Sequence, residues 1–347
     1  MRPPAPIALL LIVPLALVAC GGGGGDPDPT GPTATAFVVL GTPDASSPSP
    51  APTSAPADGP SETLDTTGAT GELISLDWLA GSAAFPAVPS PFAPPAADAD
   101  LLAAVEAALD GLDGGFSVIV HNLADGRYAA INPNTAYYAA SLFKAPVLLE
   151  TYRQRDLGII DFATELTVGE EVVRYDLGTL TYLGIEEGDM VLLREAVEAM
   201  IVVSDTALAN LVLEVVGYGN VDATLREIGA TTMSVSTRDL PTTAADMYAV
   251  ISSIATGDGV SEGSRQEMLS LMAQEWFRSG VVAGIPAGTP FAHKTGSFTD
   301  ATHDVALVDG PAGPYIIVVL SDRSYRWEPI ASISAAVWGH FAGDPEA

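Results

Sequence analysis

Strand-like segments lie at both ends of one region of this chain, with helical patterns between them, and this order most constrains its fold. Segments 114–123 and 127–131 read as strands, and Asp125-Gly126 between them is a hairpin turn signal. Three more strand-like segments follow near the C-terminus, at 290–297, 302–309 and 314–320. Apolar residues recur at helical spacing elsewhere, at 191–202, 205–216, 220–228, 242–254, 262–274 and 329–342. The order predicts an α+β fold: a five-stranded antiparallel sheet from N- and C-terminal segments, flanked by helices, with an inserted all-helical subdomain.

Residues 1–20 are typical of a secretion signal. Arg2 precedes an apolar run of about a dozen residues, which is too short to span a bilayer. The run ends in Leu17-Val18-Ala19-Cys20, followed by five glycines, and this resembles a bacterial lipobox in which Cys20 is lipidated. An ordinary signal peptide that ends in a chance cysteine is the alternative. Either interpretation predicts an extracytoplasmic protein, and the lipobox predicts a lipid anchor to the bacterial cell envelope.

Residues 21–98 are expected to form a disordered tether, and residues 99–347 the folded domain. Fourteen of the 27 prolines fall in the first segment, among Gly, Ser, Thr and Ala. Such a composition cannot bury enough apolar surface to offset the entropy lost on ordering. The pattern therefore predicts one domain carried on a spacer.

Charge and cysteine content exclude several classes of protein. The formal net charge is −29, from 14 Lys and Arg against 43 Asp and Glu, which argues against nucleic acid and anionic lipid as partners. One cysteine permits no intrachain disulfide. Because no CxxC, HExxH or EF-hand pattern occurs, we expect no metal and no cofactor. We expect a monomer that binds a small-molecule substrate and touches the membrane only through the lipid anchor.

The chain has two lysines, and both lie in segments that can carry chemistry. Ser141 and Lys144 are three residues apart at the start of an apolar segment, so a helix places them on one face. A helix that is apolar nearly all round is buried, and burial lowers the pKa of a lysine. A neutral Lys144 beside a serine hydroxyl is a nucleophile–base pair. The alternative is a capping serine and a lysine that extends to solvent.

Two further segments add polar groups at domain-scale spacing. Ser204, in Val203-Ser204-Asp205-Thr206, is either a helix cap or a second hydroxyl that relays a proton to the leaving group. In Lys294-Thr295-Gly296-Ser297, strand alternation places Lys294 and Gly296 on one face. A glycine in a strand permits close approach of a ligand backbone, and Lys294 would supply a fixed charge for a substrate carboxylate.

Together the three segments resemble SxxK, SDN and KTG, the signature set of the serine β-lactamase and penicillin-binding-protein superfamily, with class A β-lactamase as the nearest match. The resemblance spans residues 99–347. It implies that Ser141 is the acylated nucleophile, Lys144 its base and Ser204 the proton shuttle. It also implies a substrate-binding group, namely Lys294, Thr295, Gly296 and Ser297 with Thr206.

The resemblance further implies that the backbone N–H groups of Ser141 and Ser297 form an oxyanion hole. Asn210 matches a structural asparagine of the family.

Two departures from the family pattern bear on turnover. Thr206 stands where the family has an asparagine, and a threonine cannot offer both an amide donor and a carbonyl acceptor. The ExxLN segment, whose glutamate activates the deacylating water, is missing from the shortened loop before Leu240. Glu227 lies in a helical run and is expected to point elsewhere, and Asp239, the one nearby carboxylate, is expected to have an ordinary loop role. The departures predict efficient acylation with slow or rerouted deacylation.

Other functions compete with β-lactam hydrolysis. Gly259-Val260-Ser261-Glu262-Gly263 matches a GxSxG elbow, but a helical pattern and a loop precede it, so Ser261 is better explained as a helix N-cap. A triad of Ser261, Asp304 and a histidine is a minor alternative. On the same fold, the chain could act on D-alanyl peptides or esters, or serve as a non-catalytic binding module.

Overall fold

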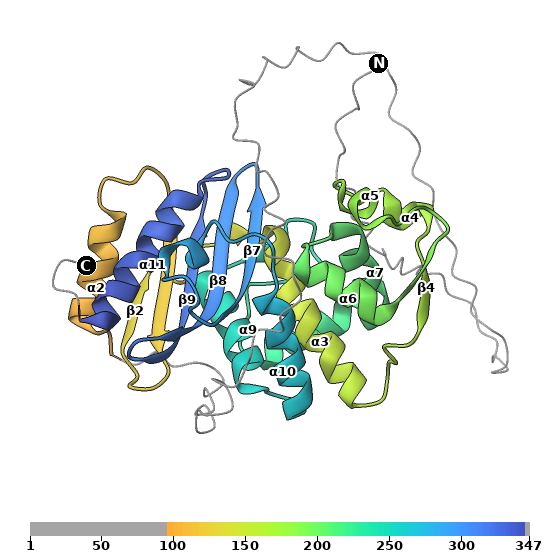
Figure 1. The fold of residues 1–347 in the computed structure, drawn as a ribbon, viewed down its shortest axis with the longest axis horizontal. Helices are drawn as coiled ribbons and strands as arrows, with labels where there is room; N and C mark the ends of the chain where they lie inside the picture. The colour runs from red at the N-terminus through yellow and green to blue at the C-terminus, as the bar shows by residue number, and fades with distance from the viewer. Residues whose placement is uncertain (1–95, 344–347) are drawn as a thin grey trace, which may run out of the picture. The chain divides into compact units, whose positions relative to one another are not determined.

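The structure, a computed structural model, describes residues 96–343. The predicted signal segment, the lipidation site at Cys20 and nearly all of the predicted tether lie outside these residues. Strand order in the main sheet is β2-β1-β9-β8-β7, with every neighbouring pair antiparallel. Its strands are β1 (Phe116–Asn122), β2 (Tyr128–Ile131), β7 (Phe291–Phe298), β8 (Ala301–Gly310) and β9 (Gly313–Ser321). The predicted α+β fold with a sheet from both chain ends is confirmed (Figure 1).

Strand β9 sits at the centre of the sheet because its side chains are apolar on both faces. Tyr315 to Leu320 form a run rich in β-branched residues, and every one of them is fully buried. Ile316 and Val318 pack in the core on one side of the sheet, and Ile317 and Val319 pack in a second core on the other side. The central strand thus joins the two hydrophobic cores of the domain.

Helices cover both faces of this sheet (Figure 1). The helices α2 (Ala99–Leu109) and α11 (Trp327–Ala342) pack with each other and supply apolar side chains to the second core, the one that holds Ile317 of β9. Asp98 caps α2, because its side chain accepts the N–H of Leu101 at 2.9 Å. On the opposite face, α9 (Ala244–Thr256) packs against β1, β8 and β9.

The middle of the chain forms the predicted helical insertion. It contains α3 (Lys144–Asp156), α6 (Leu193–Val202), α7 (Thr206–Val216), α8 (Tyr218–Glu227) and α10 (Glu262–Ala273). Residues 156–190, which have no clear periodicity, include β4 (Glu165–Thr167), α4 (Glu170–Val173) and α5 (Thr179–Leu183), and β4 pairs with β5 (Met190–Leu192). Such short elements bury few residues and leave little periodic signal in the sequence.

Four short elements connect the insertion to the sheet. The two-residue strands β3 (Tyr137–Tyr138) and β6 (Pro241–Thr242) pair antiparallel. The 3₁₀ turn η2 (Ala140–Phe143) follows β3, and η3 (Val281–Gly284) precedes β7. We call η2 the nucleophile turn, because it carries Ser141, the nucleophile predicted from the sequence.

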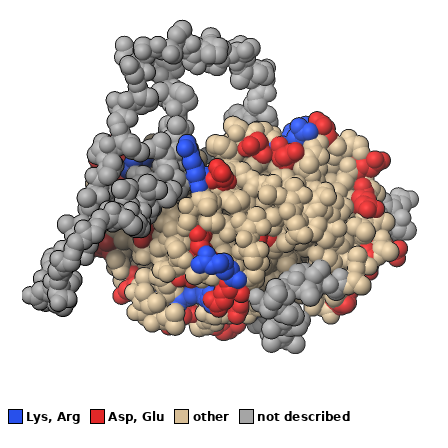
Figure 2. Space-filling model, turned by 180° about the vertical axis from the view of Figure 1, so that it is seen from behind, with Lys and Arg blue, Asp and Glu red and all other residues tan. Residues whose placement is uncertain are grey.

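The exposed surface of the domain is acidic. Figure 2 shows Asp and Glu side chains spread over one face, with the fewer Lys and Arg side chains close to acidic ones. Within residues 96–343, no helix combines the length and apolar character that crossing a membrane requires.

Candidate active site

The nucleophile turn holds Ser141 shortly before the first residue of α3. The sequence places Ser141 at the start of a helix; the structure puts it in a 3₁₀ turn, with Lys144 opening the α-helix. Ala140 has φ +46°, an unusual value for a residue other than glycine, so the backbone turns sharply just before the serine. The N–H of Ala139 donates to the carbonyl of Leu240 at 2.8 Å, which ties the turn to the β6 segment.

His303 supports the strand that leads into this turn. Its Nε2 lies 2.8 Å from the carbonyl oxygen of Tyr138, and the N–H of Ser321 donates to its Nδ1 at 3.2 Å. A carbonyl can only accept, so Nε2 carries the proton and the ring is neutral. Burial of the ring lowers the pKa of His303 to about 4.

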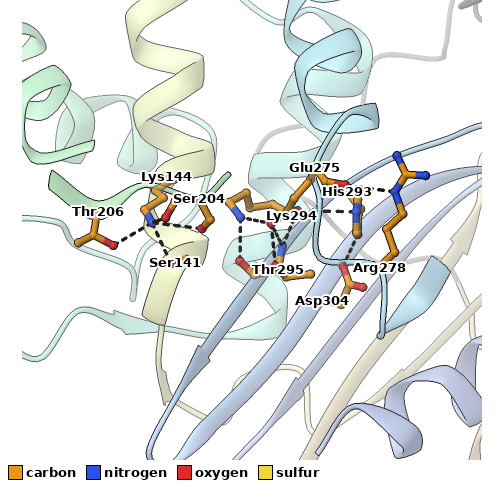
Figure 3. A network of polar contacts seen from close by, with 10 residues as sticks. All are labelled: Ser141, Lys144, Ser204, Thr206, Glu275, Arg278, His293, Lys294, Thr295 and Asp304. Carbon is orange, nitrogen blue, oxygen red and sulfur yellow. Dashed lines mark hydrogen bonds and ion pairs between the residues drawn. The ribbon is translucent and has the colours of Figure 1, made fainter. Parts of the chain in front are cut away.

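Lys144 is fully buried and lies among the hydroxyl groups of the first two motifs (Figure 3). Its Nζ is 3.0 Å from Ser141 Oγ, 3.2 Å from Ser204 Oγ and 3.1 Å from Thr206 Oγ1, and it donates to the carbonyl of Ser204. Burial holds the pKa of Lys144 well below its usual value, and the charge of Lys294 lowers it further. The amine is therefore readily neutral, which a general base requires.

The second motif is held in place by its own turn and helix cap. Ser204 has φ +56° and links α6 to α7. The buried carboxylate of Asp205 accepts the N–H of Leu208 and the hydroxyl of Thr179 on α5. Asn210 Nδ2 donates to the carbonyl of Thr206 at 2.7 Å, within the first turn of α7. Asn210 thus takes a structural position, and Thr206 keeps a contact with the lysine of the first motif.

The third motif lies on β7, the edge strand of the sheet next to the nucleophile turn. A Cβ atom on Gly296 would lie 3.1 Å from the carbonyl oxygen of Ala139 and 3.2 Å from the N atom of Leu142. The glycine therefore lets the strand approach the nucleophile turn closely, whereas the sequence suggested a close approach by a ligand backbone.

The free edge of β7 offers backbone donors to the site. The N–H of Thr295 donates to the Glu275 carboxylate, so it points away from β8. N–H groups two residues apart in a strand point the same way, which directs the N–H of Ser297 to this edge, beside the nucleophile turn. This edge is where the oxyanion hole implied by the family resemblance requires the N–H of Ser297 to lie.

Glu275 is a site residue that the sequence did not reveal. It follows α10 and is fully buried, and its carboxylate accepts from Lys294 Nζ, from the Thr295 N–H at 2.9 Å and from Thr295 Oγ1 at 2.7 Å. Lys294 is also fully buried, so its charge meets Glu275 and not solvent. A single acidic residue between Gln274 and Trp276 carries no periodic or motif signal, so only the fold identifies it.

Two further ionisable residues pack behind this ion pair (Figure 3). His293 Nδ1 lies 3.1 Å from Asp304 Oδ1, and His293 Nε2 lies 3.7 Å from Glu275 Oε2. Burial alone would lower the pKa of His293, but the charges of Asp304 and Glu275 outweigh it, and the pKa is raised. We call Glu275, His293, Lys294 and Asp304 the buried ion cluster.

Several sequence candidates lie apart from this site. Asp239 is exposed in the loop before β6, and its carboxylate makes no hydrogen bond to Ser141 or Lys144 among the described residues. Glu227 pairs with Arg153 at 2.7 Å, so it points elsewhere as expected. Ser261 caps α10 by accepting the N–H of Ser264, which fits the N-cap interpretation and leaves no Ser261–histidine hydrogen bond in residues 96–343. In the same range no cluster of His, Cys, Asp or Glu could hold a metal ion.

Comparison with known proteins agrees with this fold. Residues 100–341 match the family described as the beta-lactamase enzyme family, and the chain belongs to that family. PBP-A superposes with a TM-score of 0.67 at 22% identity, over 72% of this chain and 99% of its own. A variant of PBP-A was determined as an acyl-enzyme complex with penicillin G.

Two β-lactamases give similar superpositions. An ancestral class A β-lactamase gives a TM-score of 0.62 at 27% identity, over 68% of this chain and 98% of its own. The β-lactamase of Sphaerobacter thermophilus gives 0.62 at 21% identity, over 71% of this chain and 98% of its own. No curated protein matches the chain. The resemblance to class A β-lactamases is thereby confirmed at the level of family and fold.

Proposed function

We propose that this serine hydrolase of the β-lactamase type is acylated at Ser141 by β-lactam amides. The observation that carries the proposal is the position of Lys144: a buried amine with a lowered pKa, 3.0 Å from the serine hydroxyl. A base of this kind within hydrogen-bond distance of a hydroxyl activates it as a nucleophile.

The acylation step uses the groups already described. Neutral Lys144 takes the proton of Ser141 as Oγ forms a bond to the lactam carbonyl carbon. The carbonyl oxygen becomes an oxyanion that accepts from the N–H groups of Ser141 and Ser297. When the C–N bond breaks, the leaving nitrogen takes a proton from Ser204 Oγ, and Ser204 recovers it from Lys144, 3.2 Å away. The products are an ester at Ser141 and an opened ring.

We propose that deacylation is slow. Hydrolysis of the ester needs a base that activates water, and no carboxylate of residues 96–343 hydrogen-bonds to Ser141 or Lys144. Thr206 replaces the asparagine of the family and makes one contact with Lys144 through its hydroxyl. Both features favour an acyl-enzyme that is hydrolysed slowly and is therefore seen as a transient adduct.

The proposal extends to the surroundings of the enzyme. The signal-like segment and Cys20 support an extracytoplasmic, lipid-anchored protein, and the net charge of −29 supports a small-molecule substrate over nucleic acid. We propose that the enzyme works as a monomer.

Incubation of the purified protein with benzylpenicillin, followed by intact mass over time, tests the function. A transient adduct that needs Ser141 supports a slow β-lactamase. A persistent adduct supports the alternative, an enzyme that acts on D-alanyl peptides or esters, and no adduct supports a binding module. Ser141→Ala should abolish any adduct; an adduct that survives in this variant refutes the assignment of the nucleophile.

A further inference from the structure

The donors expected to receive a substrate carboxylate already bind a carboxylate of the chain itself. Glu275 accepts from Lys294 Nζ, from the N–H of Thr295 and from Thr295 Oγ1, which has one proton to donate. Glu275, Lys294 and Thr295 are each at most 4% exposed, so water cannot easily replace these hydrogen bonds. An incoming carboxylate would have to compete with Glu275 for the same hydrogen bonds.

The charge of the buried ion cluster also disfavours an anion. Lys294 contributes one positive charge, and Glu275 and Asp304 contribute two negative ones, so a protonated His293 brings the sum only to zero. Beside the cluster, Arg278 Nε donates to the backbone carbonyl of Glu275 at 3.3 Å, and its guanidinium lies over the ring of Phe291, 5.4 Å from the ring centroid (Figure 3). Lys144 is uncharged when it acts as the base. The buried ion cluster by itself therefore offers no net positive charge to a substrate.

The edge of β7 fixes where Glu275 lies relative to the reacting carbonyl. The N–H of Thr295 contacts Glu275, and the N–H of Ser297 lies two residues further along the same edge. Two residues of a strand span about 7 Å, so a ligand whose carbonyl oxygen is held at Ser297 places its neighbouring substituents near Glu275. Two carboxylates at such a distance in a site shielded from water repel each other strongly.

Resting on the acyl-serine function proposed above, we propose that Glu275 is a specificity-determining residue. It occupies both donors of Thr295 and one N–H of Lys294, while a second N–H of Lys294 donates to the carbonyl of Thr295 at 3.1 Å. The site thereby favours uncharged acyl donors over those that carry a carboxylate beside the scissile amide or ester. Glu275 touches no reacting atom; it acts through the two residues that it holds.

A matched pair of β-lactams tests this inference. Benzylpenicillin and its methyl ester share one ring system and differ in the carboxylate charge. The acylation rate of Ser141 by each is measured by intact mass and divided by the rate of that compound with hydroxide. We expect the ester to acylate the wild-type protein at least about tenfold faster, a difference that corresponds to about 1.4 kcal/mol. In Glu275→Gln this preference should shrink about tenfold or reverse.

Glu267→Gln is the matched control, because Glu267 is an exposed carboxylate on α10 that pairs with Arg155. This variant should keep the wild-type ratio of ester to acid. If Glu275 has only a structural role, Glu275→Gln will change the acylation rates by ester and by free acid by the same factor. An unchanged ratio of ester to acid in this variant would overturn the inference. Should Glu275→Gln fail to fold, the wild-type ratio decides alone: acylation by the free acid as fast as by the ester refutes the inference. If neither compound acylates the wild-type protein, the proposed function itself is wrong.

Discussion

The close packing of β7 on the nucleophile turn makes Gly296→Ala a sharp test of the site geometry. The new Cβ would stand 3.1 Å from the Ala139 carbonyl oxygen and 3.2 Å from both the N atom and the Cγ atom of Leu142. Each distance is a few tenths of an ångström too short, so the strand has to move away from the turn. The move separates the N–H of Ser297 from that of Ser141. Because a displacement of about 1 Å costs roughly 100-fold in rate, we expect acylation to fall about 10- to 100-fold.

Folding stability should change much less than the acylation rate. Overpacking of this kind costs about 1–3 kcal/mol, and the smaller freedom of alanine in the unfolded chain offsets about 0.4–1 kcal/mol of it. Burst acylation by a chromogenic cephalosporin measures the rate, and urea unfolding measures the stability. Gly219→Ala is the control, because nothing lies within 4 Å of a Cβ at this position on α8; it should leave acylation unchanged. If Gly296→Ala acylates within twofold of the wild-type rate, the proposed oxyanion hole is wrong.

The remaining predictions concern the two lysines and one buried histidine. Lys144→Arg should reduce acylation by at least about 100-fold, because an arginine cannot release its proton, whereas Lys294→Arg should keep measurable activity; equal losses would show that the two roles are not distinct. The wild-type acylation rate should rise with pH and level off well below 10.5, since burial lowers the pKa of Lys144; a rate that still climbs near pH 10.5 would contradict a neutral base. His303 has a pKa of about 4 in the folded protein against 6.5 for an exposed histidine, so its contribution to stability is complete above pH 6.5 and is lost as the pH falls towards 4. The free energy of unfolding, measured with urea, should fall between pH 7 and pH 4 in both proteins, but by roughly 3 kcal/mol less in His303→Gln than in the wild type. An equal fall in the two proteins would mean that His303 does not titrate as described.

Long periodic segments made most of the fold predictable from the sequence. The apolar run of β9 and the turn at Asp125-Gly126 anticipate the sheet, and the Ser261 cap marks the start of α10. The elements that the sequence did not show, such as β4 and α5, are three to five residues long and are held by tertiary contacts. Thr179 on α5 illustrates this, because its hydroxyl binds the Asp205 carboxylate from 26 residues away in the chain.

The site was predictable where its residues are close in sequence. Three-residue spacing is enough to bring Ser141 to Lys144, even though a 3₁₀ turn replaces the first turn of the expected helix. Glu275 reaches Lys294 from another element, 19 residues away, and no periodicity encodes that contact. For Gly296 the sequence predicted a close approach by a ligand backbone, whereas the structure shows the nucleophile turn packed against it, a contact that follows only from the tertiary fold.

The order of strands in the sheet has a consequence for synthesis. Strand β1 is made early, yet one of its two neighbours is β9, with Phe116 opposite Ser321. Until about residue 321 has been made, the hairpin of β1 and β2 lacks the central strand that joins both hydrophobic cores, and β7 and β8 lack theirs. Contacts so distant in the chain form slowly, because a long loop must close before they give any stabilisation. A nascent chain can thus hold Ser141, Lys144 and Ser204 for most of its synthesis without being able to assemble the strand edge beside them. The proposed acylation of Ser141 is therefore expected only after the fold is complete, so its onset would report completed folding.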